Sequence, residues 1–281
     1  MLARVARRPR KVRRWSTVVE INSRGPYVTT PITPPMKLSI VVPAFNESAT
    51  ITGVLTSLLD LEFPCDLEIV VIDDGSTDET GALIEKFSDE RFFAVHFEKN
   101  RGKGAAILHG LSVVTGTHLL IFDADDEYDP ADTVRLVSPL MSGRAEVVYG
   151  SRMLGFGTLH PTLLHRVGNH LMTFYANVLF NTAISDLHTC LKLIPVPLMR
   201  DLRLTERGFA LDTEISAELL RKGFRPFEVP VSYVGRSVED GKKIRFSDAV
   251  RCLYVLTKVR FRPITSYGSR DRSLVPAVRS E

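Results

Sequence analysis

From Lys37 onward, short hydrophobic runs alternate with segments in which apolar residues recur at helical spacing. The runs are rich in β-branched residues and have few polar positions, which is typical of strands buried on both faces. They predict strands at 38–42, 67–72, 92–97, 118–122 and 146–150.

The segments between these runs predict helices. The clearest one places Ile51, Val54, Leu55, Leu58 and Leu59 at spacings i, i+3, i+4, i+7 and i+8, on one face of a helix. Strand–helix units repeated in this way predict an α/β fold, with a mostly parallel central sheet flanked by helices and right-handed crossovers. Ligands of such sheets bind at the carboxyl ends of the strands.

Capping and periodicity predict further elements. Ser76 and Glu79 have the capping-box spacing, which predicts that a helix begins there. Beyond Ser151 the pattern predicts an amphipathic helix at 161–182, a strand at 190–195, a helix at 212–222, a strand at 227–234 and a last helix at 246–259.

Composition and charge narrow the class of protein. The chain has 281 residues, 44% hydrophobic and 25% charged, as in ordinary globular proteins. Its three cysteines are scattered without a C-x-x-C pair, which argues against disulfide frameworks and structural zinc and favours a reducing compartment. Residues 1–36 carry a net charge of +7, which leaves −4 for the remainder. A mildly acidic body disfavours a nucleic-acid-binding protein.

The hydropathy pattern bears on location. No run approaches the roughly 20 apolar residues that span a bilayer. The basic N-terminus does not lead into an apolar signal segment. We therefore expect a cytoplasmic protein whose membrane contact, if any, is peripheral. Residues 1–36 are expected to form a disordered basic arm, 37–260 a domain, and 261–281 a flexible tail. Contact of the arm with anionic lipid or RNA, and a role as a targeting peptide, are the alternatives for residues 1–36.

Polar residues follow the predicted strands directly, where a parallel sheet binds its ligands. Asp123 and Asp125 flank a small residue, so both carboxylates can point from one strand end toward a cation such as Mg²⁺ or Mn²⁺. Glu127 is a candidate third ligand. The alternative is a solvated acidic turn that caps the helix after Pro130.

Two other clusters suit a nucleotide. Asp73 and Asp74 either cap a helix or accept hydrogen bonds from a ribose or base. Gly102-Lys103-Gly104 opens a predicted helix, and a helix start with a lysine favours an anion. The spacing is not that of a Walker loop, and no G-x-G-x-x-G follows the first strand. Together the clusters predict a nucleoside-diphosphate site suited to group transfer.

The motifs, in this order, resemble those of family 2 glycosyltransferases with the GT-A fold. The resemblance rests on VVPAFNES (41–48), VIDDGSTDET (71–80), NRGKGAA (100–106) and FDADDEYDP (122–130). The second half is similar to the dolichyl- or polyprenyl-phosphate hexosyltransferase branch in YGSR (149–152), DLHTCLK (186–192), GFALDTE (208–214) and SYVGR (232–236). The resemblance implies a nucleotide-sugar half at 37–130 and an acceptor half at 131–260.

The resemblance also implies roles for individual residues. Pro43, Phe45, Glu47 and Asp74 would line the nucleoside pocket. Lys103 would lie beside the nucleotide phosphates. Asp123 and Asp125 would hold the metal, with Glu127 at a position that is often Gln in the branch. Arg152, Lys192 and Arg236 would receive the acceptor phosphate or the diphosphate.

Three departures from the branch affect these expectations. Phe45 stands where Tyr is common, and Cys190 stands where several relatives have Gly. Many relatives carry C-terminal membrane helices that this sequence lacks, so lipid acceptance is expected to rest on the amphipathic stretch Leu163 to Phe180 and on basic residues.

The activity that the resemblance implies is an inverting, metal-dependent transfer of a hexose from a UDP- or GDP-sugar to a polyprenyl phosphate. Asp125, through the metal, would stabilise the departing diphosphate. A hydroxyl acceptor would also need a base, for which Asp212 and Glu214 are candidates, although Asp212 can equally cap a helix and Glu214 can face solvent. The alternatives are a glycosyltransferase for a soluble or glycan acceptor, and a non-catalytic nucleotide-sugar-binding protein.

Overall fold

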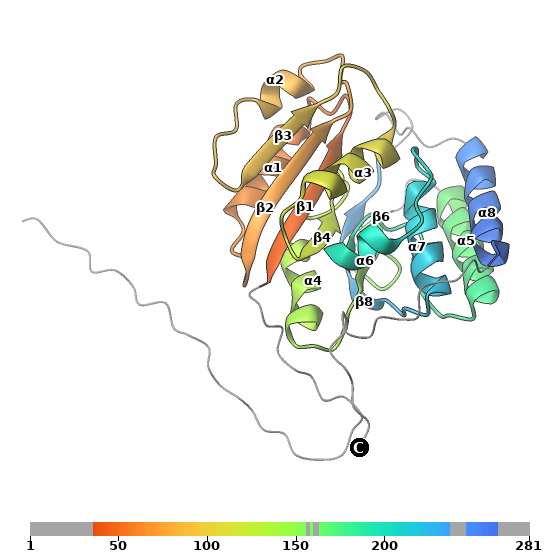
Figure 1. The fold of residues 1–281 in the computed structure, drawn as a ribbon. Helices are drawn as coiled ribbons and strands as arrows, with labels where there is room; N and C mark the ends of the chain where they lie inside the picture. Colours follow the sequence, from red (N-terminus) through yellow and green to blue (C-terminus); the bar gives the residue numbers. More distant parts are fainter. Residues whose placement is uncertain (1–35, 156–157, 160–162, 237–245, 264–281) are drawn as a thin grey trace, which may run out of the picture.

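A seven-stranded sheet forms the centre of the molecule (Figure 1). The computed structural model describes residues 36–155, 158–159, 163–236 and 246–263. The sheet has the order β3-β2-β1-β4-β7-β5-β8. Its strands are β1 (Lys37–Ala44), β2 (Asp66–Asp73), β3 (Phe92–His96), β4 (His118–Ile121), β5 (Val148–Ser151), β7 (Lys192–Pro195) and β8 (Phe227–Pro230).

The mostly parallel sheet predicted from the sequence is confirmed. The pairs β3/β2, β2/β1, β1/β4 and β5/β8 are parallel, whereas β7 runs antiparallel to both β4 and β5. The first four strands therefore end at the same edge, and the loops that follow them share that edge.

Alternating residues of the strands pack on helices on both faces of the sheet. Leu38, Ile40 and Val42 face α1 (Ile51–Asp60), α2 (Thr80–Ile84) and α4 (Asp132–Met141). Val41 and Val70 face α3 (Lys103–Val113), α6 (Val196–Asp201) and α7 (Leu211–Arg221). Burial on both faces explains why these strands are continuous apolar runs.

A third cluster extends the second half outward. α5 (Leu163–Phe180) and α8 (Phe246–Phe261) pack against α7 on the side away from the sheet (Figure 1). Buried residues of all three helices, among them Ala176, Ala217 and Val255, form the contact. A two-stranded sheet of β6 (Thr158–Leu159) and β9 (Tyr233–Val234) completes this half.

Three sequence-based expectations need correction. The run 92–97 is not buried on both faces, because β3 is an edge strand and Phe93 is 52% exposed. The predicted strand 227–234 divides after Pro230 into β8, which pairs with β5, and β9, which pairs with β6. Ser76 does not cap a helix: α2 begins at Thr80, and the Ser76 hydroxyl accepts a hydrogen bond from the amide of Asn46.

Other predictions concern the ends and the cysteines. The predicted basic arm, apart from Met36, and residues 264–281 of the predicted tail lie outside the described residues. All three cysteines are free thiols. Among the residues that the structure describes, no helix combines the length and hydropathy needed to cross a membrane.

The partly buried ring of His118 predicts a pH dependence of stability. Burial lowers the pKa of His118 from 6.5 to about 4. Because the unfolded chain takes up this proton first, the free energy of unfolding falls as the pH drops from 6.5 to 4. Between pH 6.5 and pH 4, His118 should contribute at most about 3 kcal/mol to the fall in the free energy of unfolding. We expect His118→Gln to remove this contribution, as measured by urea unfolding. An unchanged pH profile would contradict this assignment.

Candidate active site

Four loops meet at the carboxyl edge of β1 to β4. The amide of Thr77 donates to the side-chain carbonyl of Asn46 over 2.8 Å, and the amide of Asn46 donates to the Ser76 hydroxyl over 3.0 Å. The Thr50 hydroxyl donates to the carbonyl of Ala124 over 2.7 Å. The loop after β1 is thereby tied to the loops after β2 and β4, as the parallel topology predicts.

Pro43 stands where β1 leaves its neighbour β4. The last pair between these strands is Val41 with Ile121, so the missing N–H of Pro43 removes no ladder bond with β4. Pro43 is buried, and Phe45 and Glu47 follow it into the loop. The backbone of Glu47 is held by α1 and α2, since its carbonyl accepts from Ile51 and its amide donates to the Thr80 hydroxyl.

Asp73 and Asp74 organise the loops after β2 and β3. Asp73 accepts a hydrogen bond from the amide of Ser76 and lies 3.0 Å from Nδ1 of His96. The two oxygens of Asp74 accept from the amides of Arg101 and Gly102 over 2.7 and 2.8 Å. Burial raises the pKa of Asp74 above its usual value, although these bonds oppose it. Each carboxylate oxygen keeps a second lone pair for a ligand.

The predicted helix start at Gly102-Lys103-Gly104 is confirmed, and its glycines have a structural reason. Gly102 has a φ of +97°, a conformation that residues with a Cβ rarely adopt. A Cβ on Gly104 would come within 2.7 Å of the carbonyl carbon of Arg207. The amide of Ala105 donates to the carbonyl oxygen of Arg207 over 2.9 Å. The start of α3 therefore packs directly on the backbone before α7.

This close approach predicts a destabilising Gly104→Ala variant. The added methyl group must push the backbone at Arg207 away, which costs about 1–3 kcal/mol in urea unfolding. Gly53→Ala is the matched control, because α1 offers open space around Gly53 and alanine is a better helix former by about 0.5–1 kcal/mol. Equal stability changes in the two variants would contradict the packing argument.

Lys103 joins carboxylates from two halves of the chain. Its ammonium lies 2.9 Å from Asp123, after β4, and 3.3 Å from Asp212, in the first turn of α7. Lys192 of β7 is fully buried, donates to the carbonyl of Thr189 and lies 3.7 Å from Asp212. These contacts place Asp212 between two lysines.

Arg236 forms a second ionic group on the other side of the acidic loop. Its guanidinium lies 2.9 Å from Glu47 and 3.4 Å from Asp125. Both oxygens of Glu127 accept hydrogen bonds over 2.7 Å, one from the backbone amide of Arg236 and one from the Tyr233 hydroxyl. Glu127 thus holds the segment that carries Arg236.

The electrostatics of the two groups differ. Burial, together with the nearby Asp123 and Glu127, raises the pKa of Asp125 from 3.8 to about 7. Burial tends to lower the pKa of Lys103, but Asp123 and Asp212 outweigh it and hold that pKa well above its usual value. The ammonium of Lys103 therefore stays charged, whereas the Asp125 carboxylate is costly to ionise.

Asp212 and Lys192 respond to burial differently. Burial tends to raise the pKa of Asp212, but Lys103 and Lys192 outweigh it and hold the pKa below its usual value. Burial lowers the pKa of Lys192, and Asp212 only partly compensates. The Asp212 carboxylate is therefore firmly ionised.

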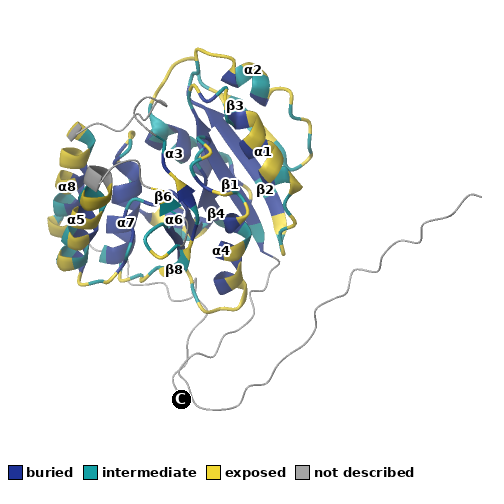
Figure 2. Cartoon of the chain, turned by 180° about the vertical axis from the view of Figure 1, so that it is seen from behind, coloured by how far each residue is buried: buried dark blue, intermediate teal, exposed yellow. Residues whose placement is uncertain are grey.

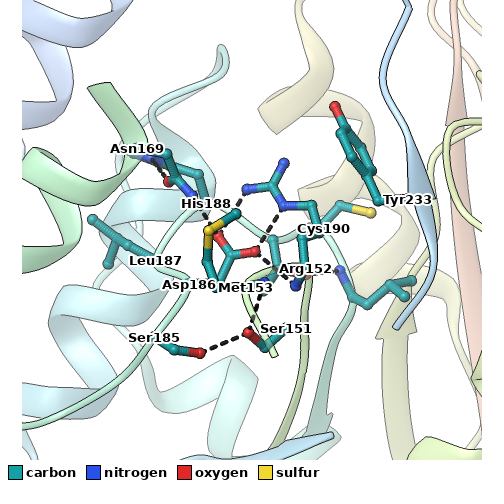
Figure 3. Close-up of polar contacts among 12 residues, drawn as sticks. Ser151, Arg152, Met153, Asn169, Ser185, Asp186, Leu187, His188, Cys190 and Tyr233 are labelled. Atoms are coloured by element: carbon teal, nitrogen blue, oxygen red, sulfur yellow. Dashed lines mark hydrogen bonds and ion pairs between the residues drawn. The ribbon is translucent and has the colours of Figure 1, made fainter. Parts of the chain in front are cut away.

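Arg152 is engaged by a buried carboxylate. Figure 3 shows its guanidinium facing Asp186, with Nε and one terminal nitrogen each 2.7 Å from a carboxylate oxygen. Asp186 also accepts from the Arg152 amide and from the side-chain amide of Asn169. The guanidinium lies 4.9 Å from the centre of the Tyr233 ring.

The structure gathers eight of the predicted site residues in the two ionic groups. Asp123, Asp125, Glu127, Lys103, Asp212, Lys192, Glu47 and Arg236 lie in the two ionic groups. Glu214 points elsewhere: it is fully buried, and its carboxylate accepts from the amides of Thr205 and Glu206 and from the Thr205 hydroxyl. The expectation that Glu214 can face solvent is wrong.

Sequence reasoning did not identify the polar residues that support Arg152. Asp186 and His188 lie in the DLHTCLK motif, and Asn169 lies on α5. Nδ1 of His188 is 3.1 Å from the side-chain oxygen of Asn169, and Nε2 is 3.1 Å from the Thr213 hydroxyl. Burial lowers the pKa of His188 to about 4, so the ring is neutral. The network joins segments that are far apart in the sequence, so residue spacing alone does not reveal it.

Two unsatisfied polar atoms mark the site. Within the described ranges, Asp212 Oδ1 and Arg236 Nε are the buried side-chain atoms that have no hydrogen-bond partner. Buried polar atoms in native proteins are nearly always paired, so orphans call for an explanation. One is an acceptor and one is a donor, and each lies in one of the two ionic groups. Each atom is therefore a candidate contact for a polar ligand.

The donor set fits a divalent cation. The site holds five carboxylates (Glu47, Asp123, Asp125, Glu127, Asp212) and three cations (Lys103, Lys192, Arg236). Burial, followed by the nearby carboxylates of Asp123 and Glu127, raises the pKa of Asp125. Among the described residues, no three His, Cys, Asp or Glu side chains are arranged to enclose a metal. Mg²⁺ needs only one or two carboxylates when substrate phosphates complete its shell.

A family model decides the identification. The model for "Glycosyl transferase family 2" matches residues 39–203, more than half of the chain. The chain belongs to glycosyltransferase family 2. It is thus a glycosyltransferase with the GT-A fold, as its motifs predicted.

Curated relatives of this family 2 chain include two proteins named as glycosyltransferases. Glycosyltransferase AglJ of Haloferax volcanii is 28% identical over 203 residues, which span 72% of this chain and 64% of that protein. Dolichyl-phosphate β-glucosyltransferase of Saccharomyces cerevisiae is 27% identical over 255 residues, which span 79% and 74%. The match thus covers less than two thirds of AglJ.

Solved structures agree on the fold. Glucosyl-3-phosphoglycerate synthase from Mycobacterium tuberculosis, in complex with Mn²⁺, UDP-glucose and phosphoglyceric acid, superposes with a TM-score of 0.63. The identity is 18%, and the match covers 81% of each chain. The same enzyme has been solved with Mg²⁺ and UDP, also at a TM-score of 0.63. At this identity the likeness concerns the fold alone.

Proposed function

We propose that this glycosyltransferase moves a hexose from a UDP- or GDP-sugar to a polyprenyl phosphate, with inversion at the anomeric carbon and with Mg²⁺ or Mn²⁺. The observation that carries the proposal is the pair of orphaned atoms, Asp212 Oδ1 and Arg236 Nε, at the edge where four loops meet. The yeast dolichyl-phosphate glucosyltransferase supports the choice of acceptor. Because such an acceptor resides in a bilayer, the enzyme would work at a membrane surface.

The donor is assigned to the loops after β1 to β4. Pro43, Phe45 and Glu47, with Asp73 and Asp74, would line the nucleoside pocket. The orphaned Arg236 Nε and the charged Lys103 ammonium would donate hydrogen bonds to the diphosphate. Lys103 now lies beside Asp123 and Arg236 beside Asp125, and the diphosphate would take over part of these contacts.

The metal is assigned to the acidic strand end. Asp123 and Asp125 would hold it, and Glu127 would support them while it keeps Arg236 in place. When bound, the metal would neutralise charge on the diphosphate as it departs. Metal binding would also require the Asp125 carboxylate to ionise. Its raised pKa means that this ionisation is costly without a nearby cation, which a bound metal would supply.

The transfer itself is a displacement. An acceptor oxygen attacks the anomeric carbon, and the bond from that carbon to the diphosphate oxygen breaks on the opposite face. The diphosphate leaves with the electron pair, and Lys103 and Arg236 stabilise its charge. Lys192 and Arg152, whose side chains are 0% and 12% exposed, would attract the acceptor phosphate.

The ionisation of Asp212 favours a phosphate acceptor over a hydroxyl. A general base works best when its pKa is near the working pH. Lys103 and Lys192 hold the pKa of Asp212 low, and Glu214 is occupied by backbone amides. A phosphate monoester is already ionised and needs no base. Asp212 Oδ1 would instead accept a hydrogen bond from a hydroxyl of the hexose.

A partition assay tests the proposal. Purified chain is incubated with labelled UDP-glucose or GDP-mannose, Mn²⁺ and a short-chain polyprenyl phosphate in detergent. We expect label in the organic phase with the phosphate acceptor and none with the matching polyprenol. Label that appears only in a water-soluble glycan, or transfer to the polyprenol at the same rate, would overturn the assignment of the acceptor.

A further inference from the structure

An apolar surface covers the outer side of α5 and α8. Eight of the fourteen large hydrophobic residues that are exposed in the described chain lie on these two helices, each 40–70% exposed. They are Val167, Leu171, Phe174 and Val178 on α5, and Val250, Leu253, Tyr254 and Phe261 on α8. We call these eight residues the α5–α8 face.

The spacing of the residues makes each helix apolar on two sides. On α8, Cys252, Val255, Leu256 and Val259 are buried inward, while the exposed residues recur at helical spacing on the outer side. On α5, Leu171, Phe174 and Val178 form the outer stripe. The inward stripes explain folding against α7, and the outer stripes have no such role. Figure 2 shows the exposed outer sides of both helices at one end of the molecule.

Two hydrogen bonds hold the helices as one platform. The hydroxyls of Tyr175 and Thr257 are 2.8 Å apart, and Nε of Arg260 donates to the carbonyl of Leu179 over 2.7 Å. Residue numbers increase in the same direction in both contacts, so the helices lie side by side and parallel. The α5–α8 face is therefore a single surface built on a fixed pair of helices.

The charges at the platform are mostly positive. Along α5 and α8, the sequence has four basic residues (Arg166, Arg251, Lys258, Arg260) and one acidic residue (Asp248). Arg251 is paired with Glu206, whereas Lys258 and Arg260 lie over the rings of Tyr254 and Phe261, within the face itself. Aromatic and aliphatic side chains edged by cations are typical of helices that lie in the interface of an anionic membrane.

We propose that the α5–α8 face docks on an anionic lipid bilayer, with both helices lying in the plane of the interface. The inner side of α5 contacts the acceptor half, since Asn169 donates to Asp186, the partner of Arg152. Docking would hold Arg152 near the lipid headgroups. The inference deepens the proposed function, because a polyprenyl phosphate is presented at such a surface, but the contact itself needs no acceptor.

Vesicle flotation tests the docking surface apart from catalysis. The full chain is mixed with vesicles of phosphatidylcholine alone or with 30 mol% phosphatidylglycerol, with no polyprenyl phosphate present. We expect binding to the anionic vesicles, and a loss of roughly tenfold or more in the partition coefficient for Leu171→Glu/Phe174→Glu and for Val250→Glu/Tyr254→Glu. Phe93→Glu, at a similarly exposed site on β3, is the matched control and should bind like the wild type.

A second measurement does not depend on disruptive charges. In a background with Trp15→Phe, which removes the only native tryptophan, Phe174→Trp should shift its emission to the blue on anionic vesicles, and Phe93→Trp should not. Wild-type chain that stays unbound, charged variants that float like the wild type, or equal shifts at both positions would overturn the proposal. A wild-type dimer that Phe174→Glu makes monomeric, without vesicle binding, would instead assign the face to a second copy.

The two proposals can fail separately. Vesicle binding without transfer to polyprenyl phosphate in detergent would support docking by the α5–α8 face and overturn the proposed acceptor. Transfer to polyprenyl phosphate in detergent without vesicle binding would support the proposed acceptor and overturn docking by the α5–α8 face.

Discussion

Asp125→Asn is expected to lower the rate of transfer by about 10³-fold while it makes the metal-free protein more stable at pH 8. The loss of activity follows from the proposed role of this carboxylate in holding the metal. The gain in stability follows from the burial of Asp125 beside Asp123 and Glu127, which raises its pKa to about 7. Function would then be obtained at a cost in stability, as is common in active sites.

The sign of the stability effect follows from linkage. Between pH 3.8 and about 7 the folded chain retains the Asp125 proton that the unfolded chain has lost, so the free energy of unfolding falls as the pH rises. Asparagine has the same shape and does not titrate. At pH 8 the variant should therefore be more stable by up to about 4 kcal/mol, and the difference should shrink toward pH 4.

The measurements are urea unfolding with a chelator at pH 8 and pH 5, and initial rates at saturating metal. Asp126→Asn is the matched control: it makes the same change one residue along, on an exposed side chain whose φ of +59° suits asparagine equally well. It should alter neither stability nor rate appreciably. A variant of Asp125 that is less stable than the wild type, or that keeps near-normal activity with metal, would contradict this account.

The first half of the domain, residues 37–130, was predictable because its signals are local. Each run of apolar residues is one buried strand, and the strand direction in strand–helix units places Asp74, Lys103 and Asp123 at the same edge before any contact is known. The capping box at Ser76 failed for a related reason. Its hydroxyl is used by the loop after β1, and sequence spacing does not reveal such a tertiary competitor.

The second half of the domain, residues 131–260, was less predictable, because its contacts join distant segments. Nothing in the spacing of Asp186 and Arg152 indicates that they pair, and the strand 227–234 gave no sign that its two ends belong to different sheets. The antiparallel direction of β7 is likewise determined by its pairing with β4 and β5 and not by its own sequence. Burial on both faces makes its pattern the same in either direction.

Asp186→Ala is expected to cause the largest loss of stability in the chain, about 3–5 kcal/mol. The carboxylate is fully buried and accepts bonds from the amide and guanidinium of Arg152 and from the side-chain amide of Asn169. Its removal leaves the Arg152 cation, only 12% exposed, without its counter-ion. Urea unfolding at pH 7 measures the effect. For comparison, Asp201→Ala removes a carboxylate that is 71% exposed and pairs with Lys222, and it should cost less than about 1 kcal/mol.

A double variant separates the structural role of the pair from its role toward the acceptor. Replacing both partners, as Arg152→Met with Asp186→Leu, removes the buried charge entirely and should restore most of the lost stability, because a buried ion pair contributes little net stability over apolar residues of similar size. If Arg152 also attracts the acceptor phosphate, the double variant should fold well and still show a raised KM for polyprenyl phosphate with an unchanged KM for the nucleotide sugar. A stable double variant with a normal KM for the acceptor would assign Arg152 to the fold alone.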